Sequence, residues 1–336
     1  MKPLPLLSLA ALLASCTALP TASEPDTLRV LVWNVWHGGN DVDQGPEKIR
    51  DLIVATDADV VLLQESYDID GDRPTTGRWL AEELGWSAHQ GTSPHLCVLT
   101  RLEIAETFHH HDWHGVGARL VDAQGREVVA WSIWLDYRAY LPRELRDRPD
   151  ATDEELLEAE SVGSSRLPQA KALLGALWGE GQLEMGVPLL VGGDWNTPSH
   201  LDWTIDAARV FRRVRALPLP VSLAMAEAGF TDAFRSVHPN PVQRPGITWT
   251  PLFRERSGDG PQGFARIDRL YVKNPSAWDP DPDHAWHLVP SAGSVLPEVW
   301  EDDAIPVRER AFPSDHAAVL LELEWQDLQR EATSEP

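Results

Sequence analysis

Cysteine is nearly absent from this sequence, with two in 336 residues. Cys16 lies near the N-terminus, and Cys97 lies within the apolar run 96–99. So few thiols exclude a disulfide framework, and a zinc site built from several thiolates, as the basis of the fold or the chemistry. We expect Cys97 to be a buried and unreactive thiol.

Positive charge is also scarce, because 29 lysines and arginines stand against 52 aspartates and glutamates, for a formal net charge of −23. Lysine contributes little of the positive charge and occurs only at Lys2, Lys48, Lys171 and Lys273. So acidic a surface repels a polyanion unless a local basic patch or a bound metal ion reverses the field. Tight, non-specific binding of duplex DNA is therefore not expected.

Long apolar runs are missing as well, apart from residues 4–13 behind Lys2. This run is too short to cross a bilayer as a helix, and it is typical of an export signal. It ends in Leu13-Ala-Ser-Cys16, which resembles a bacterial lipobox, in which the cysteine becomes the lipidated first residue. We therefore expect residues 1–16 to be a lipoprotein-type signal peptide. The protein would then be exported and lipid-anchored to a bacterial membrane, on its periplasmic or extracellular face, and the alternative is a plain secretory signal with a chance cysteine.

Between the two ends, strand and helix patterns alternate with no repeat and no clean linker, which predicts one α/β (α+β) domain over residues 28–325. Residues 17–27 are expected to form a disordered tether and 326–336 an acidic tail. Helical spacing predicts helices over 46–56, 76–84 and 150–178. Apolar runs predict strands over 28–36, 58–64, 96–100, 117–121, 128–135, 187–191, 248–250, 270–272 and 317–324. The short runs between 86 and 135 favour antiparallel sheet over βαβ units.

Polar side chains stand at the ends of several of these strands. The most informative motif is Val191-Gly-Gly-Asp194-Trp-Asn196, in which an apolar run leads into two glycines and an Asp-x-Asn pair. The other motifs supply Asn34, Glu65, Asp268, and Asp315 followed by His316. Residues at strand ends gather at one edge of a sheet, and this set of hard oxygen donors suits Mg²⁺, Mn²⁺ or Ca²⁺. Asp268 has an alternative, which is to pair with a neighbouring arginine.

These motifs, in this order, resemble those of the endonuclease/exonuclease/phosphatase superfamily with its deoxyribonuclease-I-like fold. The opening Trp33-Asn-Val-Trp-His-Gly-Gly39 is similar to exported bacterial members in particular. The resemblance implies a four-layer sandwich of two packed, mostly antiparallel sheets flanked by helices. It also implies a divalent-metal-dependent phosphoester hydrolase, either a phosphodiesterase or a phosphatase, with Mg²⁺ or Mn²⁺ as cofactor and water attacking phosphorus in line.

The resemblance also implies roles for individual residues. It gives the metal ligands as Asn34 and Glu65, with Asp315 next to the metal or the nucleophile. Asp194 would orient or deprotonate the attacking water, and Asn196 would hydrogen-bond a phosphoryl oxygen. His316, oriented by Asp268, would contact the scissile phosphate, and a histidine held by an aspartate supplies a proton or a fixed positive charge.

One position departs from the family pattern. Where the family has a histidine followed by leucine, the strand here carries Trp134, and an indole donates one hydrogen bond but exchanges no proton. Either phosphate binding is rebuilt around other groups, or catalysis is weakened. The candidates for rebuilding include His37, Tyr137 and Arg138, whose fork suits two phosphate oxygens. Arg119 resembles a family arginine near the site, with a packing role as the alternative.

Two other functions fit parts of the sequence. A secreted nuclease of the same fold needs a basic groove, and the arginines within 209–215 are the candidates for it. The second alternative, which Trp134 supports, is a degenerate lipoprotein that binds its ligand without catalysis. The acidic surface favours a small or lipid-borne phosphoester over duplex DNA as the substrate, and we expect a monomer.

The run His109–His114 is interpreted as a solvated loop rather than a metal site.

Overall fold

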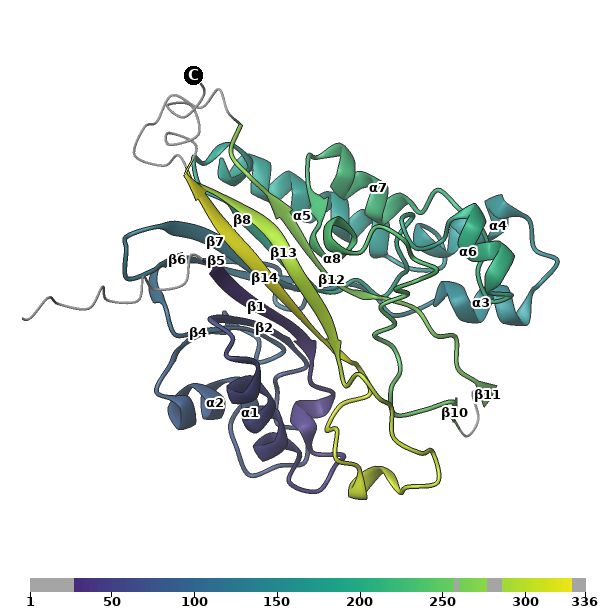
Figure 1. The fold of residues 1–336 in the computed structure, drawn as a ribbon, viewed down its shortest axis with the longest axis horizontal. Helices are drawn as coiled ribbons and strands as arrows, with labels where there is room; N and C mark the ends of the chain where they lie inside the picture. The colour runs from purple at the N-terminus through teal and green to yellow at the C-terminus, as the bar shows by residue number, and fades with distance from the viewer. Residues whose placement is uncertain (1–26, 257–259, 277–285, 328–336) are drawn as a thin grey trace, which may run out of the picture.

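The computed structural model describes residues 27–256, 260–276 and 286–327 of the chain. The expected signal peptide lies outside these residues, as do residues 17–26 of the expected tether and 328–336 of the expected tail. Two six-stranded sheets pack face to face, and helices cover their outer faces (Figure 1). The expected four-layer sandwich is confirmed. Among the described residues, no helix is both long enough and apolar enough to cross a membrane.

The first sheet contains the strands that carry Asn34 and Glu65. Its strand order is β13 (Trp286–Leu296), β14 (Ala318–Asp327), β1 (Thr27–Asn34), β2 (Val60–Gln64), β4 (Leu96–Thr100) and β3 (Ser87–His89). Only the β1–β2 pair is parallel, and the other neighbours are antiparallel.

The second sheet carries the Asp194 strand. Its order is β5 (Glu103–His110), β6 (Gly115–Val121), β7 (Glu127–Trp134), β8 (Leu189–Asp194), β12 (Asp268–Lys273) and β9 (Thr231–Asp232). Again one pair, β7–β8, is parallel. A short hairpin of β10 (Glu255–Arg256) and β11 (Gly260–Pro261) stands apart from both sheets.

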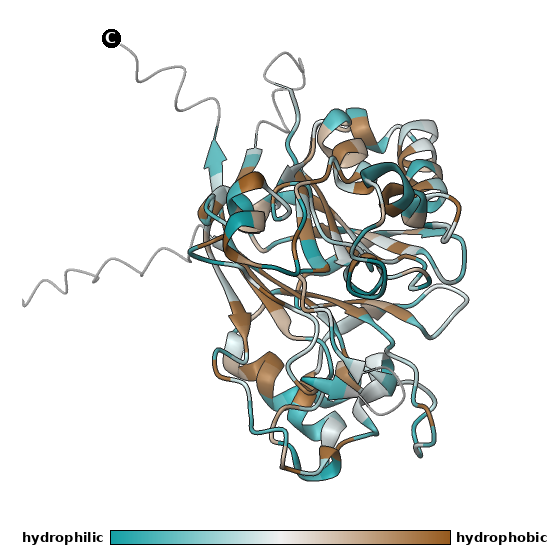
Figure 2. Cartoon of the chain, turned by 90° about the vertical axis from the view of Figure 1, so that its right-hand side faces the viewer, coloured by the Kyte–Doolittle hydropathy of each residue, from teal (hydrophilic) through white to brown (hydrophobic). Residues whose placement is uncertain are grey.

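The central strands are largely apolar, as expected where both faces of a sheet are covered. In β1, Val30 and Val32 point into the core between the sheets, whereas Leu31 and Trp33 point toward the helices. All four side chains are fully buried. In Figure 2 the central strands are mostly brown, for hydrophobic residues, whereas the helices mix brown with white and teal.

Each sheet has its own pair of covering helices. Helices α1 (Gly45–Thr56) and α2 (Thr76–Leu84) cover the first sheet, and α5 (Arg166–Gly179) and α7 (Pro220–Glu227) cover the second (Figure 1). The short helices are α3 (Leu141–Asp147), α4 (Asp153–Leu157), α6 (Ile205–Val210) and α8 (Ala233–Val237). In the described part of the chain, 3-10 turns cover His37–Gly39, Glu158–Glu160, Gln182–Glu184 and Val307–Glu309.

The ends of α2 illustrate how local sequence sets the helix bounds. The Thr75 hydroxyl accepts a hydrogen bond from the backbone N–H of Arg78, so the first turn is capped. Gly85 ends the helix with a φ of 67°, a left-handed conformation that glycine adopts without steric cost. The expected helix over 76–84 is therefore matched in the structure.

The structure differs from the expectation at several elements. The predicted helix 150–178 is broken into α4, a 3-10 turn and α5, since Gly163-Ser-Ser165 interrupts the helical run. Strand β13 was not predicted, because Pro290 and Gly293 weaken its pattern; it pairs only with β14, and such an edge position tolerates proline. Thr27 belongs to β1, and β14 runs to Asp327, so the two sheet strands extend slightly beyond the expected domain bounds of 28 and 325.

Candidate active site

The strand register brings the sequence motifs to one end of the sandwich. In the first sheet Asn34 at the end of β1 pairs with Gln64 at the end of the parallel strand β2, and Glu65 directly follows Gln64. In the second sheet Asp194 at the end of β8 pairs with Asp268 at the start of β12. His316 lies two residues before the start of β14, the antiparallel neighbour of β1. The motifs therefore meet although more than 280 residues separate the first from the last.

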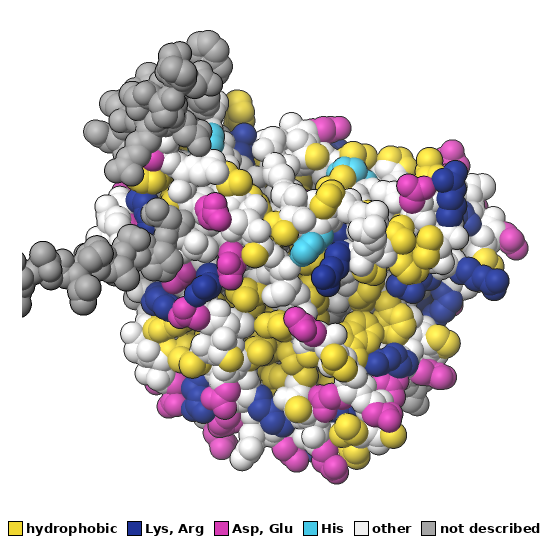
Figure 3. Space-filling view, in the orientation of Figure 1, with side chains coloured by type: hydrophobic (Ala, Val, Ile, Leu, Met, Phe, Trp, Pro, Cys, Tyr) yellow, Lys and Arg dark blue, Asp and Glu magenta, His cyan; other side chains and the backbone are white. Residues whose placement is uncertain are grey.

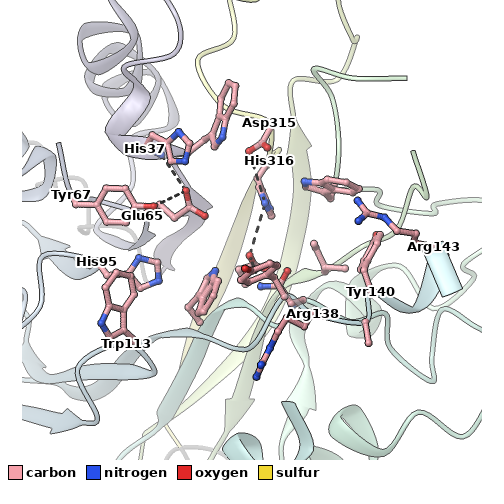
Figure 4. Close-up of a pocket in the computed structure, with 18 of the residues that line it drawn as sticks. His37, Glu65, Tyr67, His95, Trp113, Arg138, Tyr140, Arg143, Asp315 and His316 are labelled. Atoms are coloured by element: carbon pink, nitrogen blue, oxygen red, sulfur yellow. Dashed lines mark hydrogen bonds and ion pairs between the residues drawn. The ribbon is translucent and has the colours of Figure 1, made fainter. Parts of the chain in front are cut away.

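A pocket of about 720 Å³ opens at this end of the molecule. The predicted site residues in its wall are His37, Glu65, Tyr137, Arg138, Asp194, Asn196, Asp315 and His316. Asn34 and Asp268 are fully buried beneath them. Figure 4 shows Glu65 and Tyr67 on one side of the pocket, His316 at its centre and Tyr140 on the other side.

His316 and Asp268 form a buried pair at the base of the pocket. The Nδ1 atom of His316 lies 3.0 Å from Asp268 Oδ2, and Trp33 Nε1 donates to the His316 carbonyl oxygen at 2.9 Å. Burial lowers the pKa of His316, but the carboxylates of Asp268 and Asp194 outweigh burial and raise it well above the ordinary value. His316 is therefore a cation at neutral pH, and its Nε2 atom lies 3.9 Å from Asp194 Oδ2 and 4.0 Å from Asp315 Oδ1.

The neighbouring arginines do not pair with Asp268. The guanidinium of Arg266 binds Asp202 and Asp232 instead, and Arg269 donates to backbone carbonyls. Of the two alternatives for Asp268, the pairing with His316 is the one that the structure contains.

Asp194 is held in place by amide groups. The backbone N–H of Asn196 donates to Asp194 Oδ1 at 2.9 Å, and the side-chain Nδ2 of Asn196 donates to Asp194 Oδ2 at 3.1 Å. The same Nδ2 donates to the Leu135 carbonyl at 2.8 Å, so the NH₂ group of Asn196 binds within the protein while the residue lines the pocket. Burial, followed by the charge of Asp268, raises the pKa of Asp194 even though the His316 cation lowers it. Such a carboxylate takes up a proton more readily than an exposed one.

Steric crowding explains why the two residues before Asp194 are glycines. A Cβ on Gly193 would collide with the backbone carbonyl of Ile133 in the parallel neighbour β7. A Cβ on Gly192 would press on Leu62 and Val32 across the core between the sheets. Glycine at both positions lets β8 lie close to β7 and to the first sheet, which fixes where Asp194 emerges.

Glu65 lies on the opposite wall from His316. Its carboxylate accepts hydrogen bonds from the His37 backbone N–H at 3.1 Å, the Tyr67 hydroxyl at 3.2 Å and Asn34 Nδ2 at 3.2 Å. Asn34 Nδ2 also lies 3.2 Å from Asp194 Oδ2, while its oxygen accepts from the backbone N–H of Trp36. Asn34 thus holds two carboxylates side by side across the boundary between the sheets.

Several non-glycine residues of the site have left-handed backbone conformations. The φ angles are 56° at Glu65, 51° at Asn196, 54° at His37 and 42° at Trp36. Such conformations cost free energy and persist only where surrounding contacts impose them, often at functional sites. Here they turn the chain sharply just after β1, β2 and β8, so the side chains face the pocket.

The charges of the pocket fit a divalent cation. Three carboxylates, those of Asp194, Asp268 and Asp315, lie within 4.0 Å of the His316 ring nitrogens. Glu65 adds a fourth carboxylate on the opposite wall of the pocket. A hard cation offsets such a surplus of negative charge and prefers oxygen donors. Asp194, Asp268 and His316 each bring a ligand atom to within 4.8 Å of one another, but the His316–Asp268 ion pair already occupies two of them.

The predicted substrate-binding residues have different surroundings. Tyr137 is exposed at the pocket rim, and His37 binds Asp41 through Nδ1 at 2.7 Å. Arg138 also reaches the rim, but its guanidinium forms a two-pronged pair with Asp136. Arg119 is not brought to the pocket. It lies on β6, paired with glutamates of β5 and β7, which agrees with the packing role considered as its alternative.

Tyr67, Tyr140 and His95 are among the pocket residues that were not predicted from the sequence. Tyr67 binds Glu65, Tyr140 donates its hydroxyl to the Gly263 carbonyl at 2.7 Å, and His95 lies beside Tyr67. Tyr67 had a local signal, since it follows Glu65 by two residues. His95 and Tyr140 stand outside the five motifs, and only the fold brings them to the site.

Comparison with known proteins agrees with this fold and with the resemblance. A model of the Endonuclease/Exonuclease/phosphatase family matches residues 31–316. The chain belongs to this family. An uncharacterized protein of Caenorhabditis elegans, F14F9.5, is 28% identical over 327 residues, which cover 94% of this chain and 98% of that protein. Since this relative comes from an animal, membership of an exported bacterial group stays a prediction.

Solved structures share the fold at low sequence identity. A humanized D. rerio TDP2 has a TM-score of 0.54 at 14% identity, covering 89% of this chain and 99% of that one. A 3'-5' exonuclease of Neisseria meningitidis has a TM-score of 0.53 at 18% identity, covering 89% and 100%. The human nocturnin catalytic domain with a bound sulfate anion has a TM-score of 0.51 at 16% identity, covering 90% and 96%.

Proposed function

We propose that this protein is a divalent-metal-dependent phosphoester hydrolase in which water attacks phosphorus in line. The observation that carries the proposal is the buried His316–Asp268 pair, with His316 Nε2 3.9 Å from the Asp194 carboxylate, inside a pocket walled by further carboxylates. A fixed cation, a carboxylate base and an oxygen-rich metal site are what phosphoester hydrolysis requires. Family membership supports the same chemistry.

A metal ion bound in the pocket, Mg²⁺ or Mn²⁺ by its oxygen donors, would supply positive charge to the phosphoryl oxygens. Glu65 and Asp315 line the pocket and would hold it. Asn34 would join them through its amide oxygen, once its NH₂ group no longer faces Glu65. The His316–Asp268 pair would remain intact on the other side of the pocket.

The protein's own side chains divide the remaining work. Asp194 positions the attacking water and accepts its proton, and its raised pKa suits that role near neutral pH. The imidazolium of His316 donates to a phosphoryl oxygen and stabilises the charge that develops there, while Asp268 fixes its tautomer and orientation. Asn196 keeps Asp194 in place through two hydrogen bonds.

The substrate that we propose is a small or lipid-borne phosphoester. The net charge of −23 disfavours a long polyanion, and Figure 3 shows Lys and Arg side chains interspersed with Asp and Glu on the face in view. Two of the four arginines considered for a nuclease groove pair with carboxylates, Arg209 with Asp206 and Arg215 with Asp153. A secreted nuclease is therefore the weaker alternative.

We also propose that the protein carries an export signal and a lipid anchor at Cys16, which would place the site next to a membrane.

A substrate panel tests the proposal against its rivals. We expect the full-length chain to hydrolyse bis-p-nitrophenyl phosphate or one of a set of nucleotide, phospholipid and sugar phosphate esters, faster than duplex DNA. Asp194→Asn should abolish this activity, while Asp206→Asn, at an exposed ion pair, should leave it unchanged. Preferred cleavage of DNA, with binding that falls steeply with added salt, would favour the nuclease. No turnover of any ester with metal present would leave the non-catalytic binding protein.

A further inference from the structure

His95 has a buried imidazole whose nitrogens are not used by the protein. It directly precedes β4, and its backbone carbonyl accepts a hydrogen bond from the Ser66 N–H at 2.9 Å, so it is tied to the chain next to Glu65. Its relative exposure is 1%, yet it lines the pocket. Figure 4 shows it on the same side as Glu65 and Tyr67.

Neither ring nitrogen of His95 has a hydrogen-bond partner among the residues that the structure describes. A buried donor or acceptor without a partner is costly, and native proteins keep such groups mostly where a ligand satisfies them. Burial lowers the pKa of His95 to about 4, although the Glu65 carboxylate opposes this, so the ring is neutral at pH 7. A neutral imidazole offers one N–H donor and one acceptor.

Aromatic rings hold His95 in this position. Tyr67 stacks on it with ring centroids 5.6 Å apart, and Trp113 lies at 4.6 Å. Trp134 meets it edge-on at 5.1 Å, from the opposite sheet. The tryptophan that stands where the family has a histidine thus packs directly against another histidine, contributed by a different strand.

Building on the proposed function, we propose that His95 is a substrate-binding residue that binds the phosphate in place of the histidine that Trp134 replaces. Its N–H donates to a non-bridging phosphoryl oxygen on the Glu65 side of the pocket, opposite His316. The three aromatic neighbours fix the ring so that this donor needs no reorganisation when substrate binds. The second histidine of the site is thus supplied by the first sheet instead of the second.

The test replaces His95 by phenylalanine in the full-length chain. Phenylalanine fills the same space without polar atoms, so we expect the midpoint of thermal unfolding to be unchanged or higher. We expect kcat/KM for bis-p-nitrophenyl phosphate, and the affinity for inorganic phosphate as a competitive inhibitor, to fall about tenfold to a hundredfold. His95→Gln, which keeps an N–H donor, should recover part of both. His89→Phe, at a histidine of β3 that does not line the pocket, is the matched control.

The outcomes separate this proposal from the proposed function. If the wild type hydrolyses the ester and His95→Phe matches it in rate and in phosphate inhibition, the role of His95 is refuted and the hydrolase stands. If the wild type hydrolyses nothing, the hydrolase fails, and His95 is then judged by phosphate binding alone. In that case a shift of the His95 ring nitrogen signals in the NMR spectrum on adding inorganic phosphate supports the contact, and unchanged signals overturn it.

Discussion

Replacing His316 with asparagine is expected to lower kcat/KM for phosphoester hydrolysis by about 10²- to 10⁴-fold. The asparagine amide still reaches Asp268, which accepts from His316 Nδ1 at 3.0 Å, so the buried carboxylate keeps a donor. What is lost is the cation and its Nε2 atom, which lies in the pocket beside Asp194, where we propose that the phosphate binds. Steady-state kinetics with bis-p-nitrophenyl phosphate measure the effect.

Two comparisons make this result specific to the site. His238→Asn changes a histidine whose ring hydrogen-bonds the Gly293 carbonyl outside the pocket, and it should leave the rate unchanged. Circular dichroism of the His316→Asn protein should show a folded chain. A folded His316→Asn protein with the wild-type rate would exclude His316 from the chemistry.

Replacing Arg266 with methionine is expected to lower the free energy of unfolding by about 3–5 kcal/mol. Its guanidinium is fully buried and binds Asp232 at 2.7 Å and Asp202 at 3.0 Å. Removing it leaves two buried carboxylates short of positive charge, which is far more costly than losing a surface pair. Urea denaturation followed by tryptophan fluorescence measures the change.

An exposed pair gives the matched control for Arg266. Arg209→Met breaks the surface pair with Asp206, and it should cost less than about 1 kcal/mol. If both variants lose equally little free energy of unfolding, the buried network does not stabilise the fold.

The contribution of this buried network to stability also depends on pH. Burial raises the pKa of Asp202, but Arg266 and Arg235 outweigh it and hold the pKa below the ordinary 3.8. This stabilisation is therefore fully present above about pH 5 and is lost as the pH falls through the folded pKa.

Much of the candidate site was predictable because its residues are tied to strand ends. Asn34, Glu65 and Asp194 each follow an apolar run, and a run followed by a polar residue is visible in the sequence. The partner of Asp268 was not fixed by sequence, since arginines lie on both sides of it. Only the three-dimensional structure shows that Arg266 turns toward Asp202 and leaves Asp268 to His316.

The parts that escaped prediction depend on contacts between distant segments. His95 reaches the pocket because β4 pairs with β2, and nothing in its neighbouring residues indicates this. Arg138 had the right chemistry for phosphate, but its pairing with Asp136 is a matter of side-chain direction. Strand β13 escaped because edge strands tolerate proline and glycine, so its pattern was weak. Pattern alone specifies which faces are buried, and not which polar groups meet.

The measurement that tests the central claim most directly is a metal titration of hydrolysis. The full-length protein, stripped with EDTA, is titrated with Mg²⁺ or Mn²⁺ while the hydrolysis of bis-p-nitrophenyl phosphate is followed. We predict no activity without metal, a saturable rise on addition, and a demand for at least about tenfold more metal in Glu65→Gln. Glu83→Gln, at an exposed residue of α2, should behave as wild type. Full activity of the stripped protein, or a Glu65→Gln curve identical to wild type, would contradict the account.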